Sequence, residues 1–239
     1  MKYTIRRTSA TTEPLQHRPG ALPPEITKMA PEIAVRRFRR SELPVGTVPL
    51  ARFLIGKILV RRHPLGILIG RIVETEAYPP RDPAAHHFRG PTPRTRSLFL
   101  RHAHAYVYFS YGNHFMLNVS SEPAGIGGGI LIRALEPLQG MDHMERHRET
   151  SRLLDLTRGP GRLASALEID RSMDGVDLCA EGPLWLGVLL RPPDPCSRNS
   201  LPSRIGISPR IGITRAADHL LRFYERDNPF VSGPVRLRS

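Results

Sequence analysis

The chain has little cysteine, no long apolar run and no apolar segment behind its first residues. Its two cysteines among 239 residues, Cys179 and Cys196, have a spacing that suggests neither a metal site nor a disulfide framework. No run approaches the ~18 apolar residues of a membrane span, which argues against a membrane role. Residues 1–7 carry charge without an apolar run, so we expect no secretory signal and an intracellular protein.

Lysine and acidic residues are also scarce. Of the 35 basic residues only Lys2, Lys28 and Lys57 are lysines, and 22 acidic residues leave a net charge of +13. Excess positive charge costs self-repulsion and attracts polyanions such as phosphate backbones, so the composition predicts a nucleic-acid partner. The bias toward arginine has a second explanation in genomic base composition.

Two regions differ in composition. Residues 1–45 are rich in proline and include a basic run at 36–40, which predicts a mostly disordered basic arm with a short helix near its end. Residues 46–239 are expected to form one folded domain. Its β-rich runs are 57–62, 67–78, 106–110, 115–121 and 129–135; its helical stretches are 50–55, 140–152 and 161–169; a surface loop spans 191–204, and short apolar strands are expected within 211–224. The pattern predicts an α+β fold, a curved and mainly antiparallel sheet surrounded by helices.

Two acids lie within the second β-rich run. The period of two along a strand places Glu74, Glu76 and Tyr78 on one face. A face that served only the core would carry apolar residues there, so the acids indicate either a solvated face or a reaction site. Periodicity alone does not choose between them.

The loop that follows, 82–94, is dense in histidine, arginine and proline, as loops that carry sites often are. Adjacent His86 and His87 would point in different directions, and no third ligand lies at a recognised spacing. We therefore predict no metal site.

Tyrosines mark the next hairpin. Tyr106 and Tyr108 share a strand face, and Tyr111 precedes a Gly-Asn turn. These rings are explained either by sheet packing of amphipathic side chains or, in a basic protein, by a stacking platform and wedge for nucleobases.

Several segments together resemble the alkyladenine (3-methyladenine) DNA glycosylase family, of the mammalian methylpurine type, in sequence and in order over about residues 46–233. They are Glu74-Thr75-Glu76-Ala77-Tyr78, Asp82-Pro83-Ala84-Ala85-His86, Thr92-Pro93-Arg94, Tyr106-Val107-Tyr108 with Tyr111-Gly112, Asn118-Val119, Arg133-Ala134-Leu135-Glu136-Pro137, Gly159-Pro160-Gly161-Arg162-Leu163 and Leu221-Arg222-Phe223-Tyr224. The resemblance implies a fold like the formyltransferase C-terminal domain. It also implies that 46–239 is the catalytic domain.

The resemblance assigns the chemistry to Glu76, as the general base that activates water against the sugar C1′, and to Arg133 as its partner. An ionised carboxylate is expected there at neutral pH. His86 resembles a residue that helps to hold the water and the flipped nucleotide, and Tyr78, His86 and Tyr108 resemble the walls of the base pocket.

Two further roles follow from the resemblance. Asn118 resembles the pocket residue that discriminates against the guanine 2-amino group, and Tyr111 resembles the side chain that intercalates where the base has left. The expected partner is double-stranded DNA with damaged purines, bound by a cytoplasmic monomer that would be nucleoid-associated in a bacterium. Water activated by one carboxylate needs no cofactor.

Strand cleavage is not expected, because a Schiff-base lyase needs an amine and only Lys57 lies inside the predicted domain. The chain departs from the family pattern in the glycine-rich segment 122–129 and at Leu220, where the family often has proline. Both departures affect loop shape more than chemistry.

Two other functions stay open. A nucleic-acid-binding protein without catalysis, on a related fold, would share the charge and the aromatic residues, but it gains nothing from an acid at Glu76 facing phosphates. A hydrolase of soluble nucleosides would use the acid but would need neither the net charge of +13 nor an exposed Tyr111.

Overall fold

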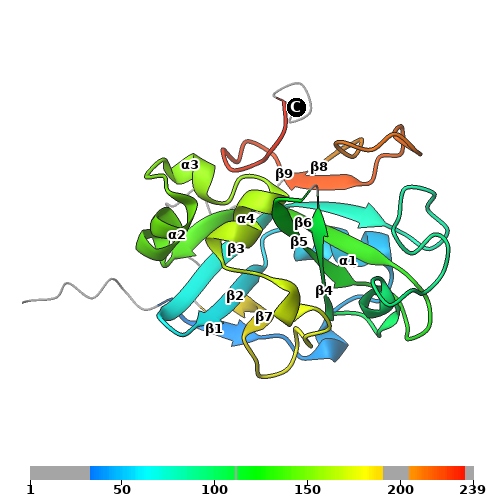
Figure 1. Cartoon of the computed structure of the whole chain (residues 1–239), viewed down its shortest axis with the longest axis horizontal. Helices are drawn as coiled ribbons and strands as arrows, with labels where there is room; N and C mark the ends of the chain where they lie inside the picture. Colours follow the sequence, from blue (N-terminus) through cyan, green and yellow to red (C-terminus); the bar gives the residue numbers. More distant parts are fainter. Residues whose placement is uncertain (1–32, 111, 191–204, 235–239) are drawn as a thin grey trace, which may run out of the picture. The chain divides into compact units, whose positions relative to one another are not determined.

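The structure, a computed structural model, describes residues 33–110, 112–190 and 205–234, and its centre is the long strand β3 (Gly66–Tyr78) (Figure 1). Within these ranges the strands form one antiparallel sheet in the order β1-β7-β2-β3-β6-β5-β4, and β9 pairs with both β3 and β8. The other strands are β1 (Val35–Arg37), β2 (Ile58–His63), β4 (Ala105–Ser110), β5 (His114–Ser120), β6 (Gly129–Gln139), β7 (Leu184–Leu189), β8 (Ile205–Ser208) and β9 (Arg222–Glu225).

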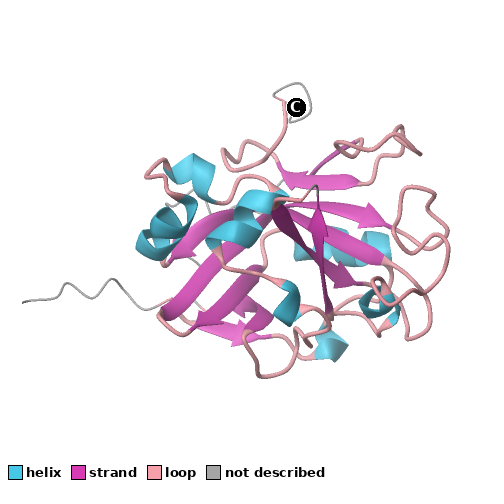
Figure 2. Ribbon diagram, viewed as in Figure 1, coloured by secondary structure: helices cyan, strands magenta, loops and turns pink. Residues whose placement is uncertain are grey.

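Helices lie around this sheet (Figure 2). They are α1 (Thr47–Leu54), α2 (Met141–Arg148), α3 (Leu153–Leu156) and α4 (Pro160–Ala166), with 3-10 turns η1 (Arg40–Glu42), η2 (Arg96–Phe99) and η3 (Arg171–Met173). In α1 the apolar Leu50, Ala51 and Leu54 recur at helical spacing and are fully buried against the sheet. No helix in the described ranges has the length and apolarity to cross a membrane.

Strand β3 is buried on both faces. Ile72 and Ala77 belong to the main core together with α1 and α4, whereas Val73 packs in a second cluster with Tyr224 and Phe230. A strand covered on both sides has no solvated face, so an acid on it must find its partners inside the protein. Glu74 and Glu76 are both 0% exposed, which makes the solvated-face interpretation wrong.

Two compensating bulges lie beside the two acids in the pairing of β3 with β6, and a further register shift lies between Ile69 and Gly70. The register runs from Ile72 opposite Leu135 to Glu74 opposite Ala134, which leaves Val73 as an extra residue on β3. The next pair is Thr75 with Ile132, which leaves Arg133 as an extra residue on β6. Bulges re-aim side chains and are frequent beside active sites. Here the second bulge presents Arg133 beside the two acids of β3.

The α+β fold and its antiparallel sheet are confirmed, as are the five β-rich runs and the helices at α1, α2 and α4. Three features differ from expectation. Residues 35–37 of the expected arm form β1, which pairs with β7 because its backbone completes that edge of the sheet. Strands β7 and β8 were not predicted, because their short sequences have no distinct pattern of apolar and polar residues. Within 211–224, where several short strands were expected, only β9 is a strand. Residues 1–32 and 191–204 lie outside the described ranges.

The core of α1 offers a stability test. Replacing fully buried Leu54 by alanine removes apolar burial and leaves a cavity, so we expect the free energy of unfolding to fall by about 2–5 kcal/mol. Leu65 lies 79% exposed in the β2–β3 turn and serves as a matched control. Urea unfolding of both alanine variants checks this, and similar losses for the two would contradict the described packing.

Candidate active site

A cavity of about 510 Å³ lies beside the second half of β3 and is bounded by β4, β5, β6 and the segment after β8. Its lining includes six of the seven predicted site residues: Glu76, Tyr78, His86, Tyr108, Asn118 and Arg133. The seventh, Tyr111, lies outside the described residues. The fold therefore brings together residues that are spread over nearly sixty positions of the sequence.

Glu76 forms the floor of this cavity. Its Oε1 accepts the backbone N–H of Ile211 at 2.7 Å and lies 3.2 Å from Nη1 of Arg133. Its Oε2 accepts the hydroxyl of Tyr78 at 3.0 Å. A carboxylate oxygen can accept about two hydrogen bonds, so within the described residues Oε2 has one acceptor position left beside Tyr78. The side chain is 0% exposed, so water reaches that position only if the cavity lining moves. The Glu76 carboxylate is thus held by one backbone N–H, one guanidinium and one hydroxyl.

Glu74 lies two residues before Glu76 on β3 and holds Arg133, the cationic partner of Glu76, in place. Its Oε1 accepts Nε of Arg133 at 2.9 Å and Nε of Arg222 at 2.7 Å, and its Oε2 accepts the backbone N–H of Ser232 at 2.6 Å. Two carboxylates and two guanidiniums thus share one buried site. Their formal charges cancel, which is the condition under which buried ions are tolerated.

The ionisation of this group follows from its contacts. Burial raises the pKa of Glu74, but Arg133 and Arg222 outweigh burial and hold the pKa below its usual value. Burial lowers the pKa of Arg133, but Glu76 and Glu74 outweigh it, and the pKa lies above its usual value. Arg133 is therefore a fixed positive charge between the two acids.

Aromatic rings form the walls. Tyr106 and Tyr108 project from the same face of β4, with ring centroids 5.4 Å apart and planes 27° from parallel. The His86 ring meets Tyr108 edge-on at 4.5 Å, and its Nδ1 lies 3.1 Å from the Tyr106 hydroxyl. Asn118 on β5 donates from Nδ2 to the Tyr106 carbonyl at 3.3 Å, which fixes the amide beside the rings.

Two of the wall residues are held neutral. Burial, with the adjacent charges of Arg94 and His87, lowers the pKa of His86, so its imidazole is uncharged at neutral pH. Burial and the proximity of Glu76 raise the pKa of Tyr78 well above its usual value. The Tyr78 hydroxyl therefore stays a hydrogen-bond donor to Glu76 at any physiological pH.

Sequence reasoning missed a second buried cation behind the wall. The guanidinium of Arg210 lies 4.6 Å from the Tyr78 ring centre, pairs with Asp82 and donates to the Ala77 carbonyl at 3.0 Å. Because Arg210 precedes Ile211, the same contacts position the N–H that Glu76 accepts. Asp82 and Arg222 stood in the quoted motifs, which was the signal for them. Nothing in the sequence distinguished Arg210 or the Ile211 amide.

The glycine-rich segment has a packing explanation. A Cβ on Gly127 would lie within 3.0 Å of Phe99 and His87, and one on Gly129 would lie 2.6 Å from Leu98. Glycine at these two positions allows the chain at the start of β6 to approach η2, and Gly127 to approach His87 of the 82–94 loop, this closely. The segment thereby holds the loop that carries His86 against the sheet.

Removing the charge of Glu74 tests the buried group. Glu74→Gln leaves two buried guanidiniums facing one acid, so we expect the free energy of unfolding at pH 7 to fall by about 3–5 kcal/mol. Because the folded-state pKa of Glu74 is lowered, its stabilisation is present above the usual carboxyl pKa and is lost as the pH falls through the folded value.

Urea unfolding at several pH values measures this loss, and the gap between wild type and variant should shrink in acid. Glu181→Gln is the control, because its 3.3 Å ion pair with Arg62 is exposed and should contribute little. A Glu74→Gln variant as stable as wild type at pH 7 would contradict the buried charge arrangement.

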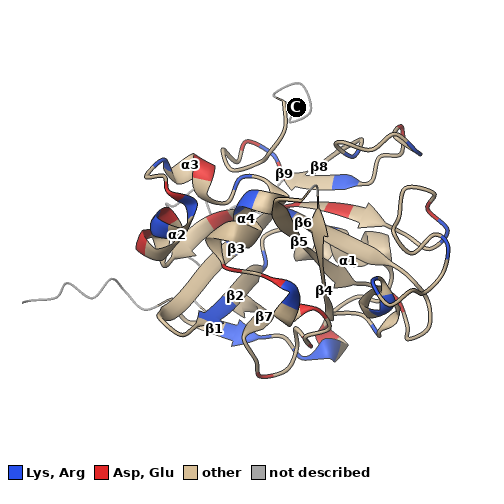
Figure 3. Ribbon diagram, viewed as in Figure 1, with Lys and Arg blue, Asp and Glu red and all other residues tan. Residues whose placement is uncertain are grey.

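Basic residues are not confined to one element of the described chain. Lys and Arg occur on strands, helices and loops (Figure 3). Five of these arginines, among them Arg133, Arg210 and Arg222, are buried.

Comparison with known proteins agrees with the geometry. The model of the family described as "Methylpurine-DNA glycosylase (MPG)" matches residues 42–229. A protein of Mesorhizobium japonicum is 60% identical over 83% of this chain and 91% of its own length, and one of Paraburkholderia phytofirmans is 48% identical over 86% and 92%. Both carry the name "Putative 3-methyladenine DNA glycosylase", as does a Methanoculleus marisnigri protein that is 44% identical over 78% of this chain and 93% of its own.

The matched region runs from η1 to the residues after β9 and so includes every described element of the cavity wall. The expected family is confirmed by these matches: the chain belongs to the methylpurine-DNA glycosylase family.

Proposed function

We propose that this protein excises 3-methyladenine and related alkylated or deaminated purines from double-stranded DNA by hydrolysing the N-glycosidic bond and leaving an abasic site. The observation that carries the proposal is the buried carboxylate of Glu76 at the floor of a cavity walled by tyrosine and histidine rings. Family membership and the names of the relatives support the same substrate class.

The depth of Glu76 requires the base to leave the duplex. The side chain is 0% exposed, so the sugar of a stacked nucleotide could not approach it. A base rotated out of the helix can enter the cavity, and its sugar and the water reach Glu76 only when the residues that cover the carboxylate move aside. Stacking on the walls adds about 1–3 kcal/mol, and a cation–π interaction with a positively charged methylated purine adds about 1–2 kcal/mol. These gains offset a flipping cost of a few kcal/mol.

Hydrolysis then needs one base and one water. Glu76 Oε2 accepts a proton from water, the water oxygen forms a bond to C1′, and the C1′–N bond breaks. In an alkylated purine that carries a positive charge, the bonding electron pair returns to the ring and neutralises this charge, so the leaving group needs no metal or cofactor. A neutral purine such as hypoxanthine leaves as an anion and takes up a proton from solvent. Arg133 fixes the acid through the 3.2 Å contact, while Glu74 balances the charge of Arg133.

Other residues have supporting roles in the proposal. Tyr78, His86 and Tyr108 stack on the base, and His86 helps to hold the water and the flipped nucleotide. Asn118, whose amide is anchored on Tyr106, would exclude the guanine 2-amino group. Tyr111 would fill the gap left in the stack.

Strand cleavage is not part of the proposal. Within the described residues no lysine lines the cavity, and the Lys57 ammonium lies 4.9 Å from the Phe53 ring centre instead. The described part of the chain therefore places no lysine where it could form a Schiff base at C1′. We therefore expect free base to be released and the DNA strand to break only after treatment with alkali.

The role of Glu76 is tested by Glu76→Gln. The amide keeps the size and one acceptor oxygen but cannot take a proton from water, so base release should fall by about 10²- to 10⁴-fold while lesion DNA still binds. Single-turnover release of free base from duplexes carrying 3-methyladenine, 7-methylguanine, hypoxanthine or ethenoadenine measures this. Exposed Glu181→Gln is the matched control. Near wild-type turnover would remove Glu76 from the mechanism, whereas the absence of base release by the wild-type protein would favour a binding protein without catalysis.

The proposed wedge is tested by Tyr111→Ser. Loss of the ring removes stacking that is made only when a base is extruded, so binding to lesion duplex should weaken by about 1–3 kcal/mol and binding to undamaged duplex should change little. Fluorescence anisotropy with both duplexes gives the two affinities. Equal losses on both would exclude the wedge, because a phosphate contact has that effect.

A further inference from the structure

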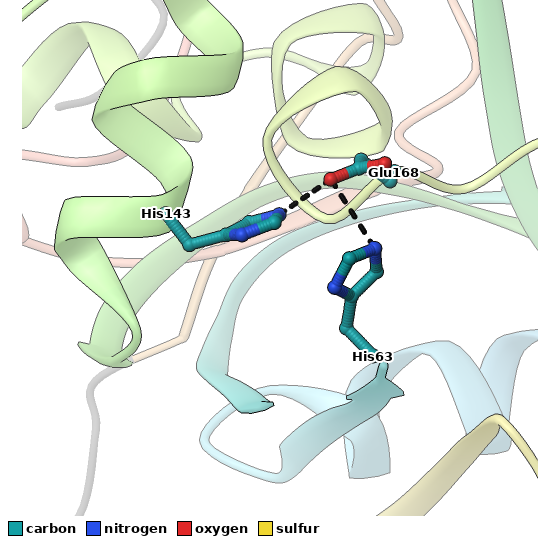
Figure 4. Close-up of side chains that lie close together, drawn as sticks. All are labelled: His63, His143 and Glu168. Atoms are coloured by element: carbon teal, nitrogen blue, oxygen red, sulfur yellow. Dashed lines mark hydrogen bonds and ion pairs between the residues drawn. The ribbon is translucent and has the colours of Figure 1, made fainter. Parts of the chain in front are cut away.

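A group of histidines surrounds one carboxylate away from the cavity described above. His63 ends β2, His143 lies in α2, and Glu168 follows α4. The Nε2 atoms of His63 and His143 lie 3.3 Å and 2.5 Å from the same Oε1 of Glu168. Figure 4 shows both imidazoles directed at that carboxylate from different elements.

A third histidine extends the group. His147 is one helical turn after His143 on α2, and its Nδ1 lies 3.6 Å from Oε1 of Glu168. The two α2 rings are nearly parallel, with planes 16° apart. Two histidines at i and i+4 on one helix face are a spacing that zinc sites use.

We propose that His63, His143 and Glu168, with His147 as fourth ligand, bind a divalent transition-metal ion of the Zn²⁺ type. The ligand atoms of the first three residues all lie within 4.8 Å of one another. Zinc bonds of 2.0–2.1 Å at tetrahedral angles require ligand atoms about 3.3 Å apart, a spacing that small side-chain rotations would give for His63, His143 and Glu168. His147, which lies outside this group, would have to turn its ring toward the ion. Imidazole nitrogens with a single carboxylate favour Zn²⁺, Co²⁺ or Ni²⁺ over Mg²⁺ or Ca²⁺.

The local backbone supports a defined role for Glu168. It has a φ of +48°, in the left-handed region where helices usually end on glycine. Holding a non-glycine residue there costs free energy, and the conformation turns the carboxylate toward the histidines.

An ion could reach the group from solvent. His147 and Glu168 line a second cavity of about 320 Å³, together with Arg61 and Asp170. The side chains of His63 and His143 are only 11% and 12% exposed, whereas those of Glu168 and His147 are 29% and 45% exposed. His63 and His143 are thus shielded from solvent, and an ion would enter from the side of Glu168 and His147.

One contact must change when the ion binds. Leu65 donates its backbone N–H to Nδ1 of His63 at 3.1 Å, which places the proton of the neutral ring on Nε2. Binding at Nε2 moves this proton to Nδ1, and the Leu65 N–H turns to water in its exposed turn. Four protein ligands close the coordination shell, as in structural rather than catalytic zinc sites. The ion would join β2, α2 and the end of α4.

Tag-free, full-length protein treated with chelator and then titrated with Co²⁺ tests the site. We expect one equivalent of Co²⁺ with the intense visible bands of four-coordinate nitrogen and oxygen ligation, and displacement of these bands by Zn²⁺. At Zn²⁺ about 100-fold above the dissociation constant, Tm should rise by about 5 °C or more.

Variants assign the ligands. His143→Ala and Glu168→Gln should each weaken the metal affinity by at least about tenfold, while His219→Ala, at an exposed histidine, should leave it unchanged. His147→Ala, on the more open face of α2, is the variant that least disturbs folding, and circular dichroism confirms the fold of each protein.

Two results would overturn the proposal: wild-type protein without a Co²⁺ spectrum or Zn²⁺-dependent rise in Tm, or folded His143→Ala and His147→Ala variants that retain full affinity. In the first case the group is a hydrogen-bonded cluster only. None of its residues lines the cavity that contains Glu76, so this outcome is independent of the excision assay.

Discussion

The buried guanidinium of Arg133 is the contact on which the site depends. It lies between Glu74 and Glu76, so it neutralises one acid and orients the other. Removing any member of this group leaves an unbalanced charge in a part of the sheet that water does not reach, which is costly. Glu74 lies outside the cavity lining, but its contacts with Arg133 and Arg222 are part of the charge balance around Glu76.

The aromatic walls position Glu76 from the side opposite Arg133. The Tyr78 hydroxyl donates to Glu76, and the guanidinium of Arg210 lies over the Tyr78 ring and pairs with Asp82. One tyrosine thus connects the carboxylate to the loop that carries His86. The aromatic walls of the cavity and Glu76 are consequently parts of one hydrogen-bonded and stacked unit, and a change in the 82–94 loop would alter the surroundings of the acid.

Much of this was predictable from the sequence, and the limits have physical causes. The strand period placed Glu74, Glu76 and Tyr78 on one face, and the shared motifs added Arg133 and Asn118. Burial of both faces of β3 was not predictable, because Val73 packs on Tyr224 and Phe230, about 150 residues later in the chain. The Ile211 amide has no side-chain signature at all, and β1 lay in a segment whose proline and arginine content concealed a three-residue edge strand. Long-range pairing decided each of these cases.

The paired bulges also constrain how this sheet can change over time. Val73 adds one residue to β3 and Arg133 adds one to β6, so the two insertions cancel and the strands return to step at Thr75. Deleting either residue alone would slip the remaining pairs by one position and turn the inward side chains of residues 74–78 to the opposite side. A lineage could therefore lose these two residues only together, and the arginine that serves the acids doubles as the spacer that keeps the ladder aligned.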